Sequence, residues 1–447
     1  MKGIRIALMI LAVMVLGLPA AEQTTAQARL LQAKAAYNEG NRVKAEALFL
    51  QVIELDPDQS AAYYFLGLLA KSPAGALPRF REYTALEPGD AWGWLALGNT
   101  WLKLGRTVEA LRAYERAAQT AQEAEDIKQA LAKGKLRAAP TLQPLGGTSV
   151  DSDGTHVARA GLAGDMAFRG GFRLGGLAIA SWLDDGTQTQ AGRTSIEELL
   201  LRLEGRPSPV VRLEAGLGAA RHAGDGKKSG SASWTTPEAE VRVRWRAPDE
   251  GLALDIRAQR KPLIANPLLA LNKAVSNEAR LGLDVPAGPF RIRGTGRAGW
   301  IEARGEKANR RLQSGIALVR PLGASGEVSL QAHWLGFARA SSAGYFAPRA
   351  VETLEAGTAW EIGGNGPVAA SLDLGAGIQR LAKAGEAFGL WKTALRGWGT
   401  ISIELLPTLQ WQLEAEAYSA PFAPVGAVTA PGWKYLSVST GLKVRLR

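Results

Sequence analysis

Cysteine is absent from the 447-residue chain, and histidine is rare. Without cysteine the protein has no disulfides, thiolate catalysis, iron–sulfur clusters, cysteine-bound zinc or lipid-modified N-terminal cysteine. The three histidines, His156, His222 and His333, are too widely scattered for metal-ligand spacing. A nucleotide-binding glycine-rich motif and a nucleophile elbow are also missing from any fitting context. We therefore expect a protein that is not an enzyme and that binds no cofactor or metal.

Long apolar stretches are missing after the N-terminus. There, Lys2 and Arg5 precede an apolar run from Ile6 to Leu18, and Ala20 offers a small residue for cleavage. These features predict a signal peptide at residues 1–20, because the run is shorter than the roughly 20 residues of a membrane-spanning helix. The protein is therefore expected to leave the cytoplasm. Any later membrane insertion would have to use strands.

The charge is basic in balance, with 53 Lys and Arg against 42 Asp and Glu, a net charge of +11. Such a balance permits contact with anionic polymers or lipid headgroups. The chain is also longer than one ordinary domain. We therefore expect two structured regions with a connector between them.

The first region, residues 26–136, is rich in Ala, Leu, Glu and Lys and repeats with a period near 34 residues, which is typical of helical hairpins. Small residues let the two helices of a hairpin approach closely, and aromatic residues fill the space between hairpins. Prolines 57 and 88 close two further units, of which the second is expected to be trimmed, and residues 121–133 predict a capping helix. The clearest unit carries this alternation at Trp94, Leu97, Gly98, Trp101, Gly105, Ala110, Tyr114 and Ala117.

On these positions, residues 26–120 resemble the tetratricopeptide repeat family. The resemblance implies an α-solenoid of about three repeats whose concave groove holds peptides or partner proteins. The groove-facing candidates are Trp92, Asn99 and Lys103 of the third unit. Alternatively, Trp92 only packs on a neighbouring residue.

Residues 137–154 are rich in proline, glycine and polar residues and predict a linker. After it, residues 155–447 alternate apolar and polar side chains, as strands with two unlike faces do. Runs of about ten residues are joined by connections that are alternately short and long, with long ones near 221–237, 261–276 and 338–350. Transmembrane barrels show this asymmetry because their short turns face the periplasm. We predict an antiparallel transmembrane β-barrel, with a soluble all-β domain as the alternative.

The number of strands follows from parity. Fifteen clear strands run from residues 155–164 to residues 433–446. If short turns are periplasmic, a further strand must precede the first, and Leu142 to Val150 is the candidate. About 16 strands result, with both ends periplasmic. Tryptophans at the predicted strand ends are typical of interfacial girdles: Trp182, Trp245, Trp300, Trp334 and Trp433.

The polar faces of the predicted strands would line the lumen. Two interpretations stay open: the charged residues pair across strands and fill space, or they line a polar, mainly cationic conduit for anionic or hydroxyl-rich cargo. The lumen-lining candidates are Arg242, Arg244, Arg257, Arg291, Arg293, Arg297, Glu238, Glu240, Glu414 and Glu416.

One local segment adds a second resemblance. Gly344-Tyr345-Phe346-Ala347-Pro348, followed by a predicted strand from Val351 to Trp360, resembles a loop-to-strand segment of outer-membrane exopolysaccharide exporters of the cellulose synthase outer-membrane subunit type. Ala347 stands where that family has serine. The resemblance implies an outer-membrane channel or exporter for exopolysaccharide or another secreted polymer. We expect no nucleic-acid partner.

The same resemblance implies a periplasmic repeat domain that docks periplasmic or inner-membrane secretion proteins. Two other functions stay open. The barrel could be a non-conducting anchor or scaffold that presents the repeats, or a hydrolase that uses serine or aspartate residues on its outer loops.

Overall fold

The computed structural model describes residues 25–185, 193–226, 230–247, 251–363, 366–419 and 434–446. The chain divides near residue 138 into two compact units, a helical one and a strand-rich one. The predicted signal peptide at residues 1–20 and Trp433 lie outside the described residues. Among the helices of the described part, none is long and apolar enough to cross a membrane.

The helical unit consists of antiparallel helices joined by short turns. Residues 25–38 are helical. Six further helices follow: α2 (Arg42–Leu55), α3 (Ser60–Leu69), α4 (Pro73–Leu86), α5 (Ala91–Lys103), α6 (Thr107–Thr120) and α7 (Glu125–Ala138). Helix α3 has 10 residues against 14 in α2. The trimming predicted for the second hairpin therefore falls on its first helix, because Pro73 starts α4 early and Ser72 caps it through Gly75 N.

Aromatic rings seated on glycines hold the helices together. A Cβ on Gly98 of α5 would lie 2.5 Å from the Tyr114 ring of α6, and one on Gly67 of α3 would lie 2.7 Å from the Phe80 ring of α4. The glycines therefore make room for the rings, as the large and small alternation in the sequence predicts. Burial raises the pKa of the Tyr114 hydroxyl, which donates to Asn99 Oδ1 at 2.8 Å.

The last helix of this unit closes its apolar surface. Capping was predicted for residues 121–133, and α7 occupies Glu125–Ala138. Its Ile127 is fully buried against Ala91 and Ala117. A solenoid needs such a cap because its final hairpin has no neighbour.

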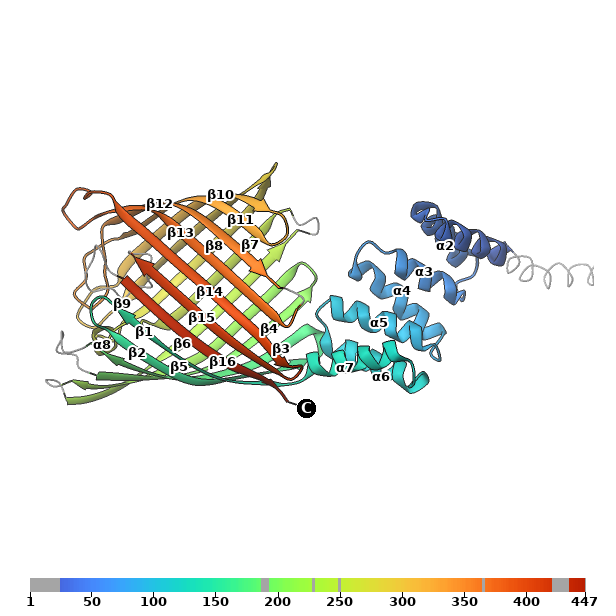
Figure 1. Cartoon of the computed structure of the whole chain (residues 1–447), viewed down its shortest axis with the longest axis horizontal. Coiled ribbons are helices and arrows are strands. Elements are labelled where there is room, and N and C mark those ends of the chain that lie inside the picture. Colours follow the sequence, from blue (N-terminus) through green and yellow to red (C-terminus); the bar gives the residue numbers. More distant parts are fainter. Residues whose placement is uncertain are drawn as a thin grey trace, which may run out of the picture. The chain divides into compact units, whose positions relative to one another are not determined.

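The strand-rich unit is a closed antiparallel barrel, drawn from green to red in Figure 1. Sixteen strands of the described chain form it in sequence order, and β1 pairs with both β2 and β16. The strands are β1 (Thr141–Asp151), β2 (His156–Phe168), β3 (Phe172–Asp184), β4 (Arg193–Ser208), β5 (Val211–Gly226), β6 (Gly230–Arg246), β7 (Ala253–Pro262), β8 (Val275–Ala287), β9 (Phe290–Glu302), β10 (Asn309–Leu322), β11 (Gly326–Phe337), β12 (Ala350–Ile362), β13 (Val368–Ala382), β14 (Lys392–Leu406), β15 (Leu409–Ser419) and β16 (Lys434–Arg445).

This architecture confirms the predicted fold, a helical repeat region followed by an antiparallel barrel of 16 strands. The strand required by parity exists as β1, which takes up most of the segment predicted as linker and possible first strand at 137–154. Because β1 and β16 close the sheet, no edge is left with unpaired backbone groups.

Alternation along each strand separates an apolar exterior from a polar lumen. Leu217, Leu330 and Leu199 are 70%, 65% and 61% exposed on the outside. Large exposed apolar area of this kind on a closed barrel is typical of a surface that faces lipid. Trp182 and Trp300 lie on the same exterior face at strand ends, as interfacial tryptophans do.

Long and short connections lie at opposite ends of the barrel. The short turns include residues 209–210, 288–289 and 407–408, and the long loops include 303–308, 338–349 and 383–391. One predicted long loop is wrong. Residues 221–226 continue β5 and residues 230–237 belong to β6, and pairs such as His222 with Trp234 extend the ladder. Small and hydroxyl residues conceal the alternation there.

Replacing Gly98 with alanine tests the aromatic packing of the helices. Its Cβ must displace the Tyr114 ring, so we expect a loss of about 1–3 kcal/mol in the free energy of unfolding of the helical unit. Helix unfolding in the full chain can be followed by far-UV circular dichroism during chemical denaturation. Gly75→Ala is the control, because its Cβ would meet Ser72 Oγ at an ordinary 3.6 Å. Equal unfolding of the two variants would contradict the packing role.

Candidate functional site

Strand alternation turns the ten predicted lumen residues toward the inside of the barrel. Arg242 and Arg244 of β6 follow Glu238 and Glu240 at every second position. Cross-strand pairing sets Arg242 opposite Arg257 of β7. The remaining candidates occupy inward positions of two other strands: Arg291, Arg293 and Arg297 on β9, and Glu414 and Glu416 on β15.

The predicted arginines all form ion pairs, mostly with carboxylates that the sequence prediction did not name. Arg242 Nε donates to Asp255 Oδ1 at 2.9 Å, and Arg244 pairs with Glu214. Arg257 is the exception, because it pairs with the predicted Glu240 at 3.0 Å. Such pairing holds the side chains in place and leaves little uncompensated charge on the inner face of β5 to β7.

Two arginines of β9 share an ion-pair chain. Arg291 Nε lies 2.7 Å from Asp284 Oδ1, and Arg293 Nε lies 3.2 Å from the other oxygen of Asp284. Arg293 also donates to Glu327 Oε2 of β11 at 2.8 Å. These ion pairs therefore join residues of three strands, β8, β9 and β11, on the inner face of the barrel.

The predicted acidic residues fall into two groups. Glu240 bridges Arg257 and Arg202, the latter at 3.1 Å. Glu414 accepts from Trp398 Nε1 at 2.7 Å, and Glu416 accepts from the Tyr418 hydroxyl at 2.9 Å. One carboxylate oxygen of Glu238 is buried without a hydrogen-bond partner among the described residues. Most of these acids therefore do not neutralise the predicted arginines.

A second cluster, of which only Arg297 was predicted, surrounds Glu278 of β8. Arg280 contacts Glu278 at 2.6 Å, Arg297 of β9 at 3.6 Å, and Arg311 of β10 at 3.8 Å. Gln259 of β7 also donates to Glu278. Alternation could have placed each of these side chains in the lumen, but their convergence depends on the register of four strands.

A long loop folds inward between β7 and β8. It includes the short helix α8 (Pro267–Leu271), whose N-cap Asn266 accepts from Leu269 N at 3.0 Å. Leu269 packs in a buried cluster with Ile301 of β9 and Phe337 of β11. On its other side, Ala270 packs with Val157 of β2 and residues of β3 to β5.

These contacts extend from β2 to β11, so the segment 263–274, which we call the inner loop, crosses the lumen at the end that carries the long loops. Trp234 fixes it further. Its ring stacks on His222 at a centroid distance of 3.8 Å, and its Nε1 donates to Ala270 O at 3.1 Å.

The loop at residues 338–349 holds the inner loop from the side. Asn266 Nδ2 donates to Gly344 O at 2.8 Å, and Tyr345 is buried in the same cluster as Leu269. Burial raises the pKa of Tyr345. The segment that resembles exopolysaccharide exporters, Gly344 to Pro348, therefore holds the inner loop through Gly344 and Tyr345. As predicted, a strand follows it, β12 over Ala350–Ile362.

Glu306 anchors this second loop. Its carboxylate accepts from Ser342 N at 2.6 Å and from the Ser341 hydroxyl at 2.8 Å. Burial opposes ionisation of Glu306, but these hydrogen bonds outweigh it and hold its pKa below the ordinary value.

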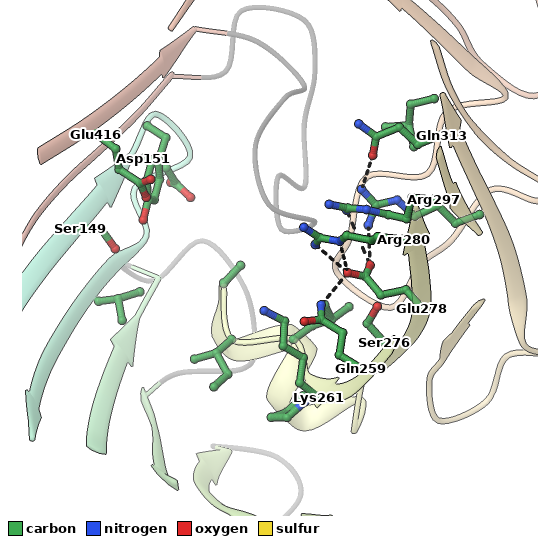
Figure 2. A pocket seen from close by; sticks show the side chains of 18 of the residues that line it. Ser149, Asp151, Gln259, Lys261, Ser276, Glu278, Arg280, Arg297, Gln313 and Glu416 are labelled. Atoms are coloured by element: carbon green, nitrogen blue, oxygen red, sulfur yellow. Dashed lines mark hydrogen bonds and ion pairs between the residues drawn. The ribbon is translucent and has the colours of Figure 1, made fainter. Parts of the chain in front are cut away.

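Beside the inner loop, the lumen contains a cavity of about 520 Å³, which we call the chamber. Figure 2 shows its two sides, with Asp151, Ser149 and Glu416 on one and the cluster around Glu278 on the other. Leu263 and Ile264 of the inner loop also line it. The volume lies within the roughly 300–1,000 Å³ of typical small-molecule sites.

On the helical unit, the three predicted groove residues share one face of α5. Trp92, Asn99 and Lys103 are spaced by seven and four positions and are all exposed. Trp92 is 48% exposed, so about half of its surface is open to a ligand. Asn99 is also fixed by the hydrogen bond from Tyr114.

Comparison with known proteins identifies the helical repeats. Residues 67–134 match the family model of the tetratricopeptide repeat. The helical unit therefore contains tetratricopeptide repeats, as the sequence predicted. A search of curated proteins found no match.

Several solved structures are similar to parts of the chain. A bacterial polysaccharide outer membrane secretin matches 69% of this chain and 99% of its own, with 12% identity and a TM-score of 0.48. The FrpB iron transporter from Neisseria meningitidis matches 65% of this chain and 55% of its own, with 11% identity and a TM-score of 0.37. MamA from Desulfovibrio magneticus RS-1 matches 25% of this chain and 65% of its own, with 23% identity and a TM-score of 0.24.

Charge reversal at Arg242 tests the ion-pair lining. Arg242→Asp would face Asp255 with a like charge, so we expect the barrel to lose about 1–3 kcal/mol of stability. The temperature at which the folded band disappears in heat-modifiability gels should fall accordingly. Adding Asp255→Arg should restore much of the loss. Arg246→Asp is the control, because Arg246 forms no ion pair with the described residues; an equal loss there would refute a specific role for the pair.

Proposed function

We propose that the protein is an outer-membrane channel that exports a polymer, with exopolysaccharide as the cargo class. The observation that carries this proposal is the chamber, a cavity of about 520 Å³ with charged side chains in its lining, inside a closed barrel whose exterior is apolar. Side chains alone can fill a barrel of about eight strands, whereas a barrel of 16 strands is wide enough to leave a water-filled passage.

The inner loop supports a gated form of this channel. It crosses the lumen beside the chamber and is held by side-chain contacts and a few hydrogen bonds to other loops and to Trp234. Loops held this way can move without breaking the strand ladder, as lids and gates do. We infer that transport requires displacement of the inner loop.

The tetratricopeptide repeats complete the proposal. Trp92 and Lys103 offer an aromatic and a cationic contact on one exposed face of α5. We infer that this face binds secretion proteins of the periplasm or inner membrane. We also propose that the protein is not an enzyme.

The second candidate function is a sealed anchor for the repeats. It is favoured by the same inner loop, whose contacts extend from β2 to β11. The two functions differ in whether the lumen conducts once this loop is removed.

Shortening the inner loop separates these functions. Leu263 N donates to Ala274 O at 2.9 Å, so the two chain ends are adjacent and an Asn-Gly turn can replace residues 264–273. We expect the single-channel conductance in planar bilayers to rise several-fold over the unaltered protein. Asn266→Ala, which loses both the helix cap and the bond to Gly344 O, should give intermittent openings. Leu390→Ala in another long loop is the control; a silent bilayer with the shortened variant would establish the sealed anchor.

The absence of cysteine allows a clean test of orientation. Single variants Leu390→Cys at the long-loop end and Ser325→Cys at the short-turn end place one thiol each at exposed positions. In intact cells, a membrane-impermeant maleimide should label the first and not the second. Lys103→Cys on the repeats should react only after the outer membrane is permeabilised. Labelling of Ser325→Cys in intact cells would reverse the proposed orientation.

A further inference from the structure

The two walls of the chamber carry opposite charge. Its basic wall is formed by β7 to β10, which contribute Lys261, Arg280, Arg297 and Arg311 around the single carboxylate of Glu278. Four cations against one anion leave a formal surplus of three positive charges. His333 of β11 extends this wall.

Several donors on the basic wall are not used within the described part of the protein. Glu278 is already occupied by Arg280 and Gln259. Arg297 approaches it only to 3.6 Å, and Lys261 forms no ion pair or hydrogen bond with the described residues. Arg311 is 7% exposed, and its Nε is buried without a partner. A buried guanidinium with an unused N–H group is costly unless a ligand or water completes it.

The opposite wall is acidic. Asp151 of β1 and Glu416 of β15 line it, against one cation, Arg159 of β2, whereas Glu198 of β4 lies between the two walls, three strands from β7 and Lys261. In the closed ring of 16 strands, β1 lies opposite β9, and β15 lies opposite β7. Figure 2 shows Asp151 and Glu416 on the side opposite Arg280 and Arg297.

We propose that the chamber binds an acidic sugar unit of the exported polymer, and this inference rests on the proposed channel function. The sugar carboxylate pairs with Arg297, Arg311 and Lys261 on the basic wall. Its hydroxyl groups donate to Asp151 and Glu416 on the acidic wall, because ionised carboxylates only accept hydrogen bonds. A neutral sugar leaves the surplus positive charge unpaired, and a simple anion leaves the acidic wall unused.

Binding to the folded full-length protein in detergent tests the site. Isothermal titration calorimetry with trigalacturonic acid should give saturable binding, whereas maltotriose, a neutral trisaccharide, should bind at least tenfold more weakly. Inorganic phosphate alone is the third probe and should also bind at least tenfold more weakly, because it cannot reach both walls. Raising the ionic strength should weaken the binding of trigalacturonic acid and leave the binding of maltotriose nearly unchanged.

Two variants locate the binding within the chamber. Lys261→Gln and Arg297→Gln should each lower the affinity for trigalacturonic acid about tenfold, the loss expected for one charge-assisted hydrogen bond. Lys443→Gln is the matched control, because Lys443 lies on an inward position of β16 and does not line the chamber. Its affinity should not change. Unaltered heat-modifiability of all three variants shows that they fold.

Three results would overturn the inference: equal binding of maltotriose, equal binding of phosphate, or unchanged affinity in both chamber variants. Each result can occur while the shortened inner-loop variant still conducts. In that case the proposed channel function is kept and the acidic-sugar site is rejected. Conversely, uronate binding that depends on Lys261 in a barrel that never conducts would keep the site and remove the export function.

Discussion

Closure of the hydrogen-bonded ladder between β1 and β16 is the constraint on which the rest of the barrel depends. In a bilayer, each unpaired backbone N–H or C=O costs several kcal/mol, so an open sheet edge cannot face lipid. This explains why a segment with Pro144 and several glycines is a strand at all. The ladder to β16 skips Gln143 and Pro144, of which proline has no N–H to donate, and resumes at Leu145.

Closure also determines what the lumen contains. Once the ring is closed, every second side chain points inward, and polar side chains there must find partners within the barrel. Arg293 meets two carboxylates, whereas Glu278 meets three arginines. The charges of Arg291 and Arg293 are therefore balanced by Asp284 and Glu327, and the wall around Glu278 retains a positive surplus. The difference comes from which residue types the register brings together, not from overall composition.

The sequence predicted the features that depend on local periodicity and missed those that depend on tertiary contacts. The repeats were predictable because Gly98 and Tyr114 must differ in size for two helices to meet. The 16 strands followed from alternation and parity. The inner loop was not predictable, since Leu269 and Ala270 look like ordinary apolar residues of a long connection until Ile301 and Val157 face them. Pairing partners of the lumen arginines depended on register in the same way.

The chamber and the inner loop are linked through one strand. Gln259 and Lys261 line the chamber near the end of β7, and the inner loop begins two residues later at Leu263. A ligand can shift a loop only if it binds the displaced arrangement more tightly than the closed one. A polymer unit attracted to the basic wall would occupy space beside Leu263 and Ile264, which line the same cavity. On the proposed function, Leu263 and Ile264 are therefore the residues through which a polymer unit in the chamber would act on the inner loop.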